Sequence, residues 1–221
     1  MFGAVCGDVV ASIYESPMFE VESLDFPLFV GAARFTDDSV LTVALADAIL
    51  CNTPYEEKIK EWHDKYPNSG YGSRFVEWAE NFGPNNKIVN DSYSNGAMMR
   101  VSPIGYAFDT LEQVDKEAER SVAFTHNNDE ARRGAKAIAN AVFLARKGRT
   151  KPYIQRFIEE KFGYDLSYRV QHVRDHFDKR TIRCDVTGPQ ALIVFLESTG
   201  FENTIRNAIY SRGDCDTISA I

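Results

Sequence analysis

The sequence predicts an all-α protein, and three observations support this prediction. Apolar residues recur at helical spacing along nearly the whole chain, as in 135–143, where they follow an i, i+3, i+4, i+7 pattern. Alternating β-branched residues are scarce, and 180–186 is the only stretch that resembles a strand, although weakly. With 221 residues and 44% apolar composition, the chain has enough material for one ordinary globular core.

The expected helices share an apolar face and, in several cases, a start or stop signal. An acidic cluster at 36–39 opens the first long helix, and glycines follow several later ones. The loop 83–94 is rich in Asn and Ser, and long loops on a helical scaffold tend to carry binding groups. The segments with helical patterns are, in order, 8–15, 40–48, 56–65, 73–81, a short one after Gly96, 135–143, 153–158, 191–196 and 205–209.

Composition excludes some classes of function. Lys and Arg number 25 against 32 Asp and Glu, a net charge of −7, which argues against general nucleic-acid binding because that needs clustered positive charge. The N-terminus lacks a positive stretch before an apolar run, and no apolar run reaches membrane-spanning length. We therefore expect a soluble, cytoplasmic protein. The four cysteines show no C-x-x-C pair and no zinc-type spacing.

Two acidic clusters, 36–39 (TDDS) and 214–217 (DCDT), each precede an apolar, helix-like run. Carboxylate and hydroxyl oxygens are the ligands that Mg²⁺ and Mn²⁺ prefer, so the clusters would form a metal centre if the fold brings them together. Thr, Ser and Asp are also preferred N-cap residues, and each cluster alone is better explained as a helix start. A helix cap needs only one side-chain oxygen, so two doubly acidic starts leave both interpretations open.

Three further candidates carry weaker signals. If 8–15 is helical, Asp8 and Glu15 lie on one side of it; alternatively, Asp8 caps that helix and Glu15 ends it. The segment 92–100 leads into an expected helix whose first N–H groups could hold a phosphate, although Asn-Gly also marks a plain turn. His126 is either a loop or capping residue or a ring that stacks on a ligand.

Taken in order, the motifs of this chain resemble those of the ADP-ribosylglycohydrolases, the family of dinitrogenase reductase-activating glycohydrolase. The resemblance covers essentially the whole chain, and the two acid motifs together are its most specific part. The matching segments are 3–15 (GAVCGDVVASIYE), 34–42 (RFTDDSVLT), 92–105 (SYSNGAMMRVSPIG), 125–126, 189–196 and 213–221 (GDCDTISAI).

The resemblance implies a compact orthogonal helical bundle in one domain, 1–221, with a central cleft that holds two divalent cations, Mg²⁺ or Mn²⁺. It implies that Glu15 is a mobile carboxylate at the cleft, acting as general base or as a gate on the metal site. The implied metal ligands are Thr36, Asp37, Asp38, Asp214, Asp216 and Thr217. The implied ADP-ribose-binding residues are Ser92, Tyr93, Asn95, Gly96 and His126.

The implied activity is metal-dependent hydrolysis of the glycosidic bond between ADP-ribose and a modified acceptor, a protein side chain or another ADP-ribosyl conjugate. Cations can hold the ribose hydroxyls and lower the pKa of water, and a nearby carboxylate can move the proton. Asp37 or Asp38 would activate the water while Glu15 guides the leaving group, or the roles would be reversed. The alternatives are a non-catalytic ADP-ribose-binding or structural protein and a nucleotide phosphohydrolase.

The chain also departs from the family pattern. Family members usually have Gly at the positions of Ala11, Ser94 and Arg212. Ser94 and Arg212 put the details of phosphate and leaving-group binding in doubt, although no metal ligand is lost. They usually continue beyond the position of Ile221, so a compact variant, cover from another chain and a truncated sequence all fit. The motifs constrain neither the oligomeric state nor the acceptor, which could be arginine, serine, a nucleobase or O-acetyl-ADP-ribose.

Overall fold

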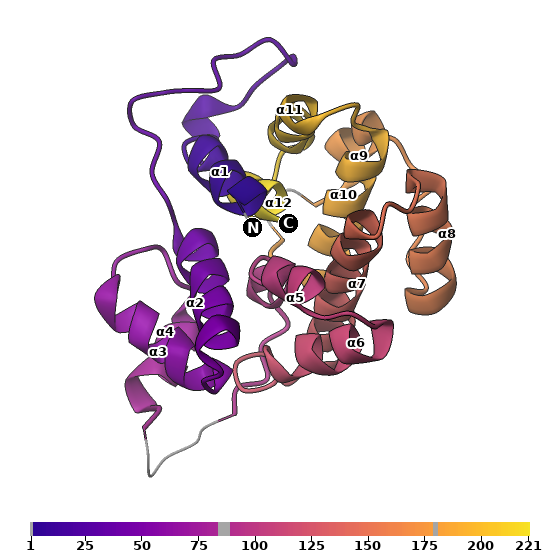
Figure 1. The fold of residues 1–221 in the computed structure, drawn as a ribbon. Coiled ribbons are helices and arrows are strands. Elements are labelled where there is room, and N and C mark those ends of the chain that lie inside the picture. Colours follow the sequence, from indigo (N-terminus) through magenta and orange to yellow (C-terminus); the bar gives the residue numbers. More distant parts are fainter. Residues whose placement is uncertain (1, 84–88, 179–180) are drawn as a thin grey trace.

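The computed structural model describes residues 2–83, 89–178 and 181–221, and these residues form α-helices and short 3₁₀ helices without a β-sheet (Figure 1). The all-α prediction is confirmed. The α-helices are α1 (Phe2–Ala11), α2 (Asp37–Cys51), α3 (Tyr55–Lys65), α4 (Ser73–Asn81), α5 (Ser102–Ala107), α6 (Leu111–Arg120), α7 (Asp129–Arg146), α8 (Lys151–Phe162), α9 (Val170–His176), α10 (Cys184–Glu197), α11 (Phe201–Ser211) and α12 (Cys215–Ala220). The 3₁₀ helices are η1 (Pro17–Phe19) and η2 (Asn95–Ala97).

Helix α7 organises the main core, where it contacts α5, α6, α8 and α10. Its buried face is rich in alanine, which lets neighbouring helices approach closely. One close approach is at Gly105 of α5, where an added Cβ would lie 2.7 Å from the Ala139 carbonyl oxygen. The helix begins at an Asn128 cap, whose Oδ1 accepts a 3.0 Å hydrogen bond from the Glu130 N–H. The capping interpretation of His126 is therefore wrong.

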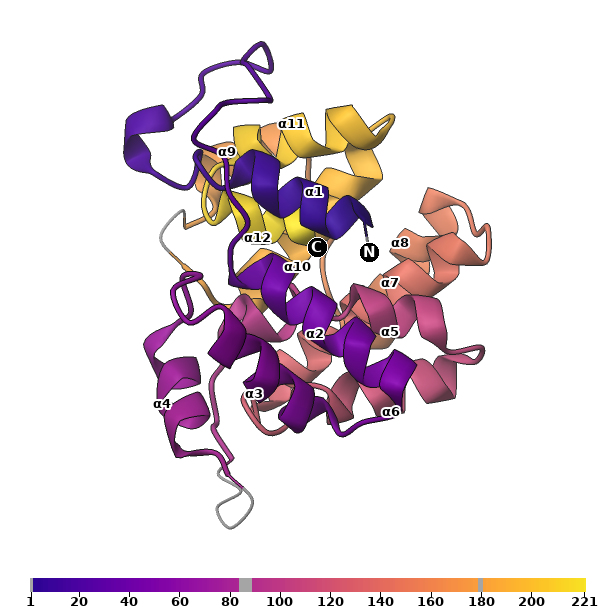
Figure 2. The ribbon, with the colours of Figure 1, turned by 60° about the vertical axis from the view of Figure 1, so that its left-hand side comes forward.

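Helices α1 and α12 pack side by side, which brings the two acidic clusters together (Figures 1 and 2). This contact depends on Gly7, because a Cβ there would lie 2.0 Å from the Ser219 carbonyl oxygen. Helix α2 then packs against both α1 and α12. The N-terminal turn of α2 therefore meets the N-terminal turn of α12, although the two helices belong to the first and last quarters of the chain.

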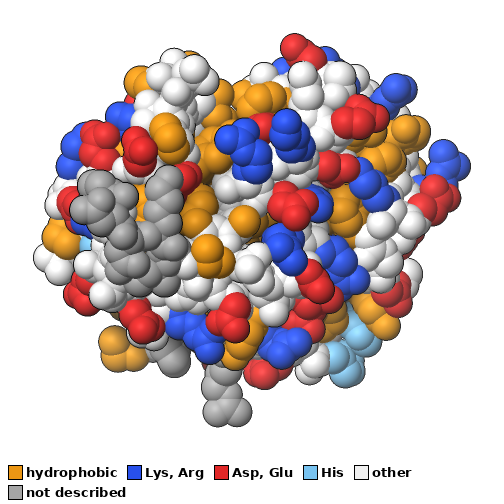
Figure 3. Space-filling model, turned by 90° about the horizontal axis from the view of Figure 1, so that it is seen from below, with side chains coloured by type: hydrophobic (Ala, Val, Ile, Leu, Met, Phe, Trp, Pro, Cys, Tyr) orange, Lys and Arg blue, Asp and Glu red, His pale blue; other side chains and the backbone are white. Residues whose placement is uncertain are grey.

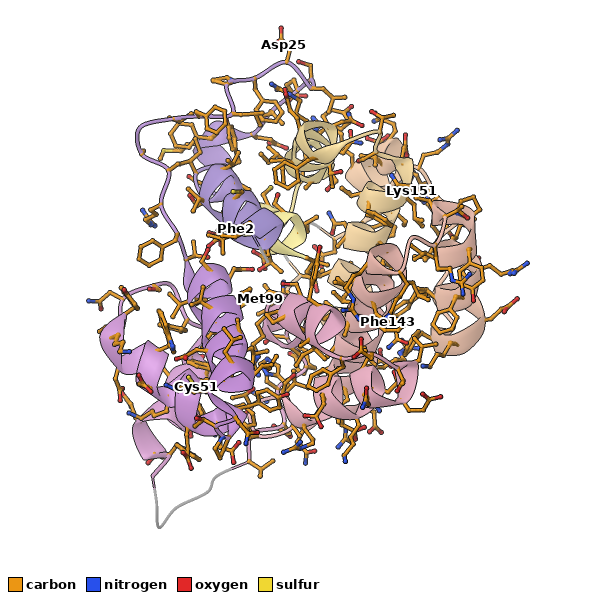
Figure 4. All side chains as sticks on the ribbon, in the orientation of Figure 1. Phe2, Asp25, Cys51, Met99, Phe143 and Lys151 are labelled. Carbon is orange, nitrogen blue, oxygen red and sulfur yellow. The ribbon has the colours of Figure 1, made fainter. Side chains whose placement is uncertain are left out.

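The first helix differs from the expected 8–15. It begins at Phe2 and ends at Ala11, so Asp8 lies inside it and is not a cap, and Glu15 lies beyond its end. Residues 12–36, here called the 12–36 segment, then leave the helical body before returning to α2 (Figure 2). Asp25 lies at the far tip of this segment (Figure 4). Tyr14, near the start of this segment, contacts Phe26, which follows Asp25, with ring centroids 5.1 Å apart.

Other expectations differ in detail. Helices α6 and α9 carry mixed polar patterns that did not predict them. The helix expected after Gly96 is divided into η2 and α5. Of the weak strand 180–186, residue 180 lies outside the described residues, while Arg183 pairs with Ser94 in one isolated bridge and α10 begins at the next residue. Of the loop 83–94, residues 84–88 also lie outside the described residues.

Among the described residues, none of the helices has the length and apolar character needed to cross a bilayer. On the face that Figure 3 shows, Lys and Arg side chains are interspersed with Asp and Glu and form no continuous basic surface.

Candidate active site

A cavity of about 470 Å³ lies at the meeting point of α2, α12 and the loop that precedes α5. Met99, which also lines it, lies near the centre of the molecule (Figure 4). The cavity brings together all twelve residues that the sequence predicted to bind metal, bind substrate or take part in catalysis. These are Glu15, Thr36, Asp37, Asp38, Ser92, Tyr93, Asn95, Gly96, His126, Asp214, Asp216 and Thr217.

Asp8 ties the start of α2 to α1. Its buried carboxylate accepts hydrogen bonds from the Thr36 N–H (2.9 Å), the Thr36 hydroxyl (2.8 Å), the Ser39 N–H (3.1 Å) and the Ser39 hydroxyl. Asp8 therefore satisfies backbone N–H groups at the N-terminus of a helix other than its own. This charge-assisted network fixes the turn that carries Asp37 and Asp38.

The capping interpretation holds for one acidic cluster and not for the other. Thr36 is the N-cap of α2, and its hydroxyl oxygen accepts a 3.3 Å hydrogen bond from the Asp38 N–H. Asp214 occupies the N-cap position of α12 but makes no side-chain cap bond. Asp216 Oδ1 accepts a 2.9 Å hydrogen bond from the next residue, the Thr217 N–H, and Asp38 Oδ2 lies 3.1 Å from the Thr36 hydroxyl. Each carboxylate keeps a second oxygen, and capping does not account for the gathering of so many acids at these helix starts.

Two groups of three carboxylates meet in the described part of the chain, and Asp216 belongs to both. Oxygens of Asp8, Asp38 and Asp216 lie within 4.8 Å of one another, and so do oxygens of Glu15, Asp214 and Asp216. Three carboxylates at such distances repel one another unless protons or a cation compensate their charge. Each of the two groups could hold a hard cation.

The pKa values of these acids reflect this repulsion and their burial. Burial first, and then the charge of Asp214, raises the pKa of Asp216 to about 9. Burial also raises the pKa of Asp37 to about 7, and it raises that of Asp38 well above its usual range, with Asp216 as the next cause. Glu15, which is exposed, has its pKa raised by partial desolvation and by Asp214.

The donor set fits a hard divalent cation. Asp38 Oδ1 is buried and has no hydrogen-bond partner among the described residues, an arrangement that is costly unless something else satisfies the oxygen. The Thr217 hydroxyl is buried as well, and its recorded partner is the weakly accepting sulfur of Met99, 4.0 Å away. The carboxylate and hydroxyl oxygens of these residues are ligands of the kind that Mg²⁺ and Mn²⁺ prefer.

The loop before α5 meets the acids through Asn95. Its Nδ2 donates a 2.6 Å hydrogen bond to Asp214 Oδ2 and lies 3.3 Å from Thr187 Oγ1. Earlier in the loop, the hydroxyls of Ser92 and Ser94 lie 3.0 Å apart. The loop is therefore fixed to the second acidic cluster by a charge-assisted bond, and serine hydroxyls line the adjoining wall.

A buried hydrogen-bonded chain supports His126. Arg100 Nη2 donates to Thr125 Oγ1 (2.6 Å), which lies 2.8 Å from His126 Nδ1, and His126 Nε2 lies 3.0 Å from Ser94 Oγ. Burial, and then the charge of Arg100, lowers the pKa of His126 well below its usual value. The ring packs against Gly96, where an added Cβ would lie 3.2 Å from His126 Nε2.

Tyr93 marks the rim of the cavity. Its side chain is 47% exposed, with the Arg183 guanidinium 5.5 Å and the Arg74 guanidinium 6.0 Å from the ring centroid. An exposed aromatic ring between two cations presents a flat surface at the entrance, a feature suited to a planar or anionic group.

The sequence did not single out some cavity residues. The segment 68–72 lines the side next to α2, and the Ser69 carbonyl accepts a 2.8 Å hydrogen bond from the Asp37 N–H. Its Asn-Ser-Gly composition is a turn signal between two expected helices and could have drawn attention to it. Arg100 carried no such signal, because a fully buried arginine looks like any other polar residue in a helical pattern.

Arg212 has a backbone conformation that normally belongs to glycine. With φ +68° and ψ −179°, it lies just before Gly213 and two residues before Asp214. For other residues such a conformation costs about 1–3 kcal/mol. The Gln190 side chain holds the Arg212 carbonyl oxygen with a 2.8 Å hydrogen bond. The family's usual glycine would adopt this conformation freely.

Comparisons with known proteins agree with this architecture. The family model for ADP-ribosylglycohydrolase matches residues 1–221. ADP-ribosylhydrolase ARH3 of Mus musculus is 30% identical over 205 residues, which cover 78% of this chain and 55% of that protein. Uncharacterized protein YegU of Escherichia coli K12 is 31% identical over 179 residues, covering 65% of this chain and 50% of that one. The chain thus spans about half the length of these curated relatives.

A solved structure supports the fold independently. The chain of an "ADP-ribosylglycohydrolase-related protein complex" superposes with a TM-score of 0.74 over 99% of this chain and 81% of that chain, at 21% identity. The expected orthogonal helical architecture is confirmed.

Proposed function

This chain belongs to the ADP-ribosylglycohydrolase family, and on that premise we propose that it hydrolyses the glycosidic bond between ADP-ribose and a modified acceptor. The proposed reaction depends on divalent cations and releases ADP-ribose. The observation that carries the proposal is the pair of carboxylate groups that share Asp216, at the floor of a cavity walled by the loop before α5. The acceptor would be a protein side chain or another ADP-ribosyl conjugate.

The residues that would hold the cations are Thr36, Asp37, Asp38, Asp214, Asp216 and Thr217, and Asp8 is a member of the first carboxylate group. When bound, divalent cations would fix the ribose hydroxyls and lower the pKa of water. Asp8 would serve mainly to orient this set, since its oxygens already accept hydrogen bonds from Thr36 and Ser39.

The remaining residues would bind and orient ADP-ribose. We assign the diphosphate to the loop at Ser92, Asn95 and Gly96, and the rim position to the exposed ring of Tyr93. His126 would form part of the wall as a neutral ring, because burial and Arg100 disfavour its protonation. Glu15 is exposed at the cavity edge, and its raised pKa suits a carboxyl group that exchanges protons with the leaving group or with water.

The test is the release of ADP-ribose from a panel of conjugates to arginine, serine, a nucleobase and acetate, with Mg²⁺, Mn²⁺ or EDTA. We expect release from at least one conjugate, loss of release in EDTA, and loss of release in Asp38→Asn. Asp25→Asn is the matched control, because it removes the same charge at the tip of the 12–36 segment, far from the cavity. Metal-dependent ADP-ribose binding without release from any conjugate would contradict the proposal and favour a binding protein.

A further inference from the structure

Two distant segments of the chain must approach each other to form the second carboxylate group. Glu15 comes from the 12–36 segment, while Asp214 and Asp216 come from the start of α12, and their oxygens lie within 4.8 Å of one another. Three carboxylates alone would push these two segments apart. A contact that holds them together has to come from elsewhere.

Arg212 makes that contact. Its Nη2 donates a 3.2 Å hydrogen bond to Glu22 Oε1, and its Nε forms an ion pair with Glu20 Oε1. Arg212 is two residues before Asp214, and Glu20 is five residues after Glu15, with η1 between them. The ion pairs therefore join the two segments next to the point where their carboxylates meet.

The backbone conformation at Arg212 indicates that its side chain makes a contact that offsets the strain. Its positive φ favours glycine, which would remove the strain but would also remove the guanidinium. The other described non-glycine residue with positive φ, Asn52, has a left-handed C-cap conformation that asparagine tolerates well. At Arg212 the conformation is unfavourable, and the side chain spans to the opposite segment.

We propose that Arg212 is a positioning residue that clamps the 12–36 segment, through Glu20 and Glu22, so that Glu15 faces Asp214 and Asp216. Arg174 also holds this part of the 12–36 segment. Its buried guanidinium donates hydrogen bonds to Glu22 Oε2 (3.0 Å) and to the Val21 carbonyl oxygen (2.9 Å). Arg212 supplies the charged link to the α12 side, beside the apolar cluster that Tyr14 and Val21 form with Cys215. The role given to Glu15 rests on the proposed function, whereas the clamp itself does not.

Hydrogen–deuterium exchange of the whole protein tests the clamp without any need for activity. We expect Arg212→Gly to speed amide exchange in 16–26 by about tenfold, because the segment opens more often. Its Tm should stay the same or rise, since the strained backbone is relieved. A merely structural role would instead lower the Tm and raise exchange throughout the molecule.

Three further variants complete the test. Arg212→Lys keeps the cation but offers one nitrogen in place of two, so its exchange should fall between those of the wild type and Arg212→Gly. Glu20→Gln with Glu22→Gln should reproduce the fast exchange of Arg212→Gly. Asp25→Asn is the matched control, because it neutralises a carboxylate of the same segment that makes no ion pair among the described residues. Unchanged exchange in 16–26 for both Arg212→Gly and the double Gln variant would overturn the proposal.

An activity measurement then separates the clamp from the proposed function. If both hold, Arg212→Gly slows ADP-ribose release about tenfold or more while ADP-ribose binding stays unchanged, because Glu15 is displaced and the binding loop is not. If the wild type releases no ADP-ribose but exchange responds as expected, the clamp stands and the proposed function fails. If release is slowed with exchange unaltered, the clamp fails and the proposed function stands.

Discussion

Asp8 accepts two hydrogen bonds from Thr36, one from the backbone N–H at 2.9 Å and one from the side-chain hydroxyl at 2.8 Å. A carboxylate in the middle of α1 thereby does what a helix cap does for α2. We expect this buried link to set the position of the Asp37–Asp38 turn and to contribute to stability.

Asp8→Ala should lower the free energy of unfolding by about 3 kcal/mol or more, since hydrogen bonds to a buried charge contribute roughly 1.5–3 kcal/mol each and four donors lose their acceptor. Urea unfolding measures this change. Asp25→Ala, an exposed acid at the segment tip, is the control and should stay within about 0.5 kcal/mol of the wild type. A loss below about 1 kcal/mol in Asp8→Ala would show that Asp8 does not hold this turn.

The metal-free protein should lose stability as the pH rises from about 4 towards 9. The pKa of Asp37 is raised to about 7 and that of Asp216 to about 9, so between pH 4 and these values the folded state holds more protons than the unfolded state. Each such group lowers stability by up to about 1.4 kcal/mol per pH unit over its window. Thermal unfolding in EDTA at pH 5 to 9 gives the slope.

Adding saturating Mn²⁺ should reverse this slope, because cations bind the deprotonated carboxylates and so compete with protons. A Tm in EDTA that does not decrease with pH, or that responds to pH in the same way with and without Mn²⁺, would be incompatible with a carboxylate metal centre. Both results come from the same set of melting curves.

Gly96→Ala should weaken ADP-ribose binding about tenfold, since its Cβ would meet the buried His126 ring at 3.2 Å and overpacking of this kind costs about 1–3 kcal/mol. Gly72→Ala is the matched control: Gly72 lines the same cavity, but a Cβ there meets nothing within 4 Å. Calorimetric titration of both variants with ADP-ribose makes the comparison. Equal affinities would place the diphosphate away from Gly96.

His126 should remain neutral down to a pH well below 6.5, since burial and Arg100 lower its pKa. The unfolded chain binds a proton near pH 6.5, so this residue contributes stability above that pH and loses it as the pH falls. Long-range ¹H–¹⁵N correlation spectra report the protonation state of each ring nitrogen. A His126 that titrates near 6.5 would contradict the buried chain through Thr125 and Ser94.

Much of this candidate site could be predicted from the sequence, because its residues form short local clusters. Metal ligands need particular side-chain oxygens at helix starts, and such clusters stand out in the one-dimensional pattern at Asp37–Asp38 and Asp214–Asp216. The all-α class could also be predicted from the sequence, because the apolar periodicity of a helix such as α7 or α2 is a local property.

The rest depends on tertiary contacts that have no local signature. One of the two interpretations of Asp8 made it a cap of its own helix, yet it accepts hydrogen bonds at the start of α2, against which α1 packs. Arg212 looked like a simple departure from glycine, and its ion pairs with Glu20 and Glu22 appear only when the 12–36 segment is folded back. Arg100 is buried by the surrounding core and not by its own neighbours in sequence.

The most direct test of the account is the number of Mn²⁺ ions that the EDTA-treated protein binds, followed by their electron paramagnetic resonance spectrum. Two carboxylate groups that share Asp216 predict two ions per chain with a spin-coupled spectrum, and loss of the coupling in Asp216→Asn. Binding of no ion, or of one isolated ion that Asp216→Asn leaves unchanged, would contradict the dimetal centre on which the proposed function rests.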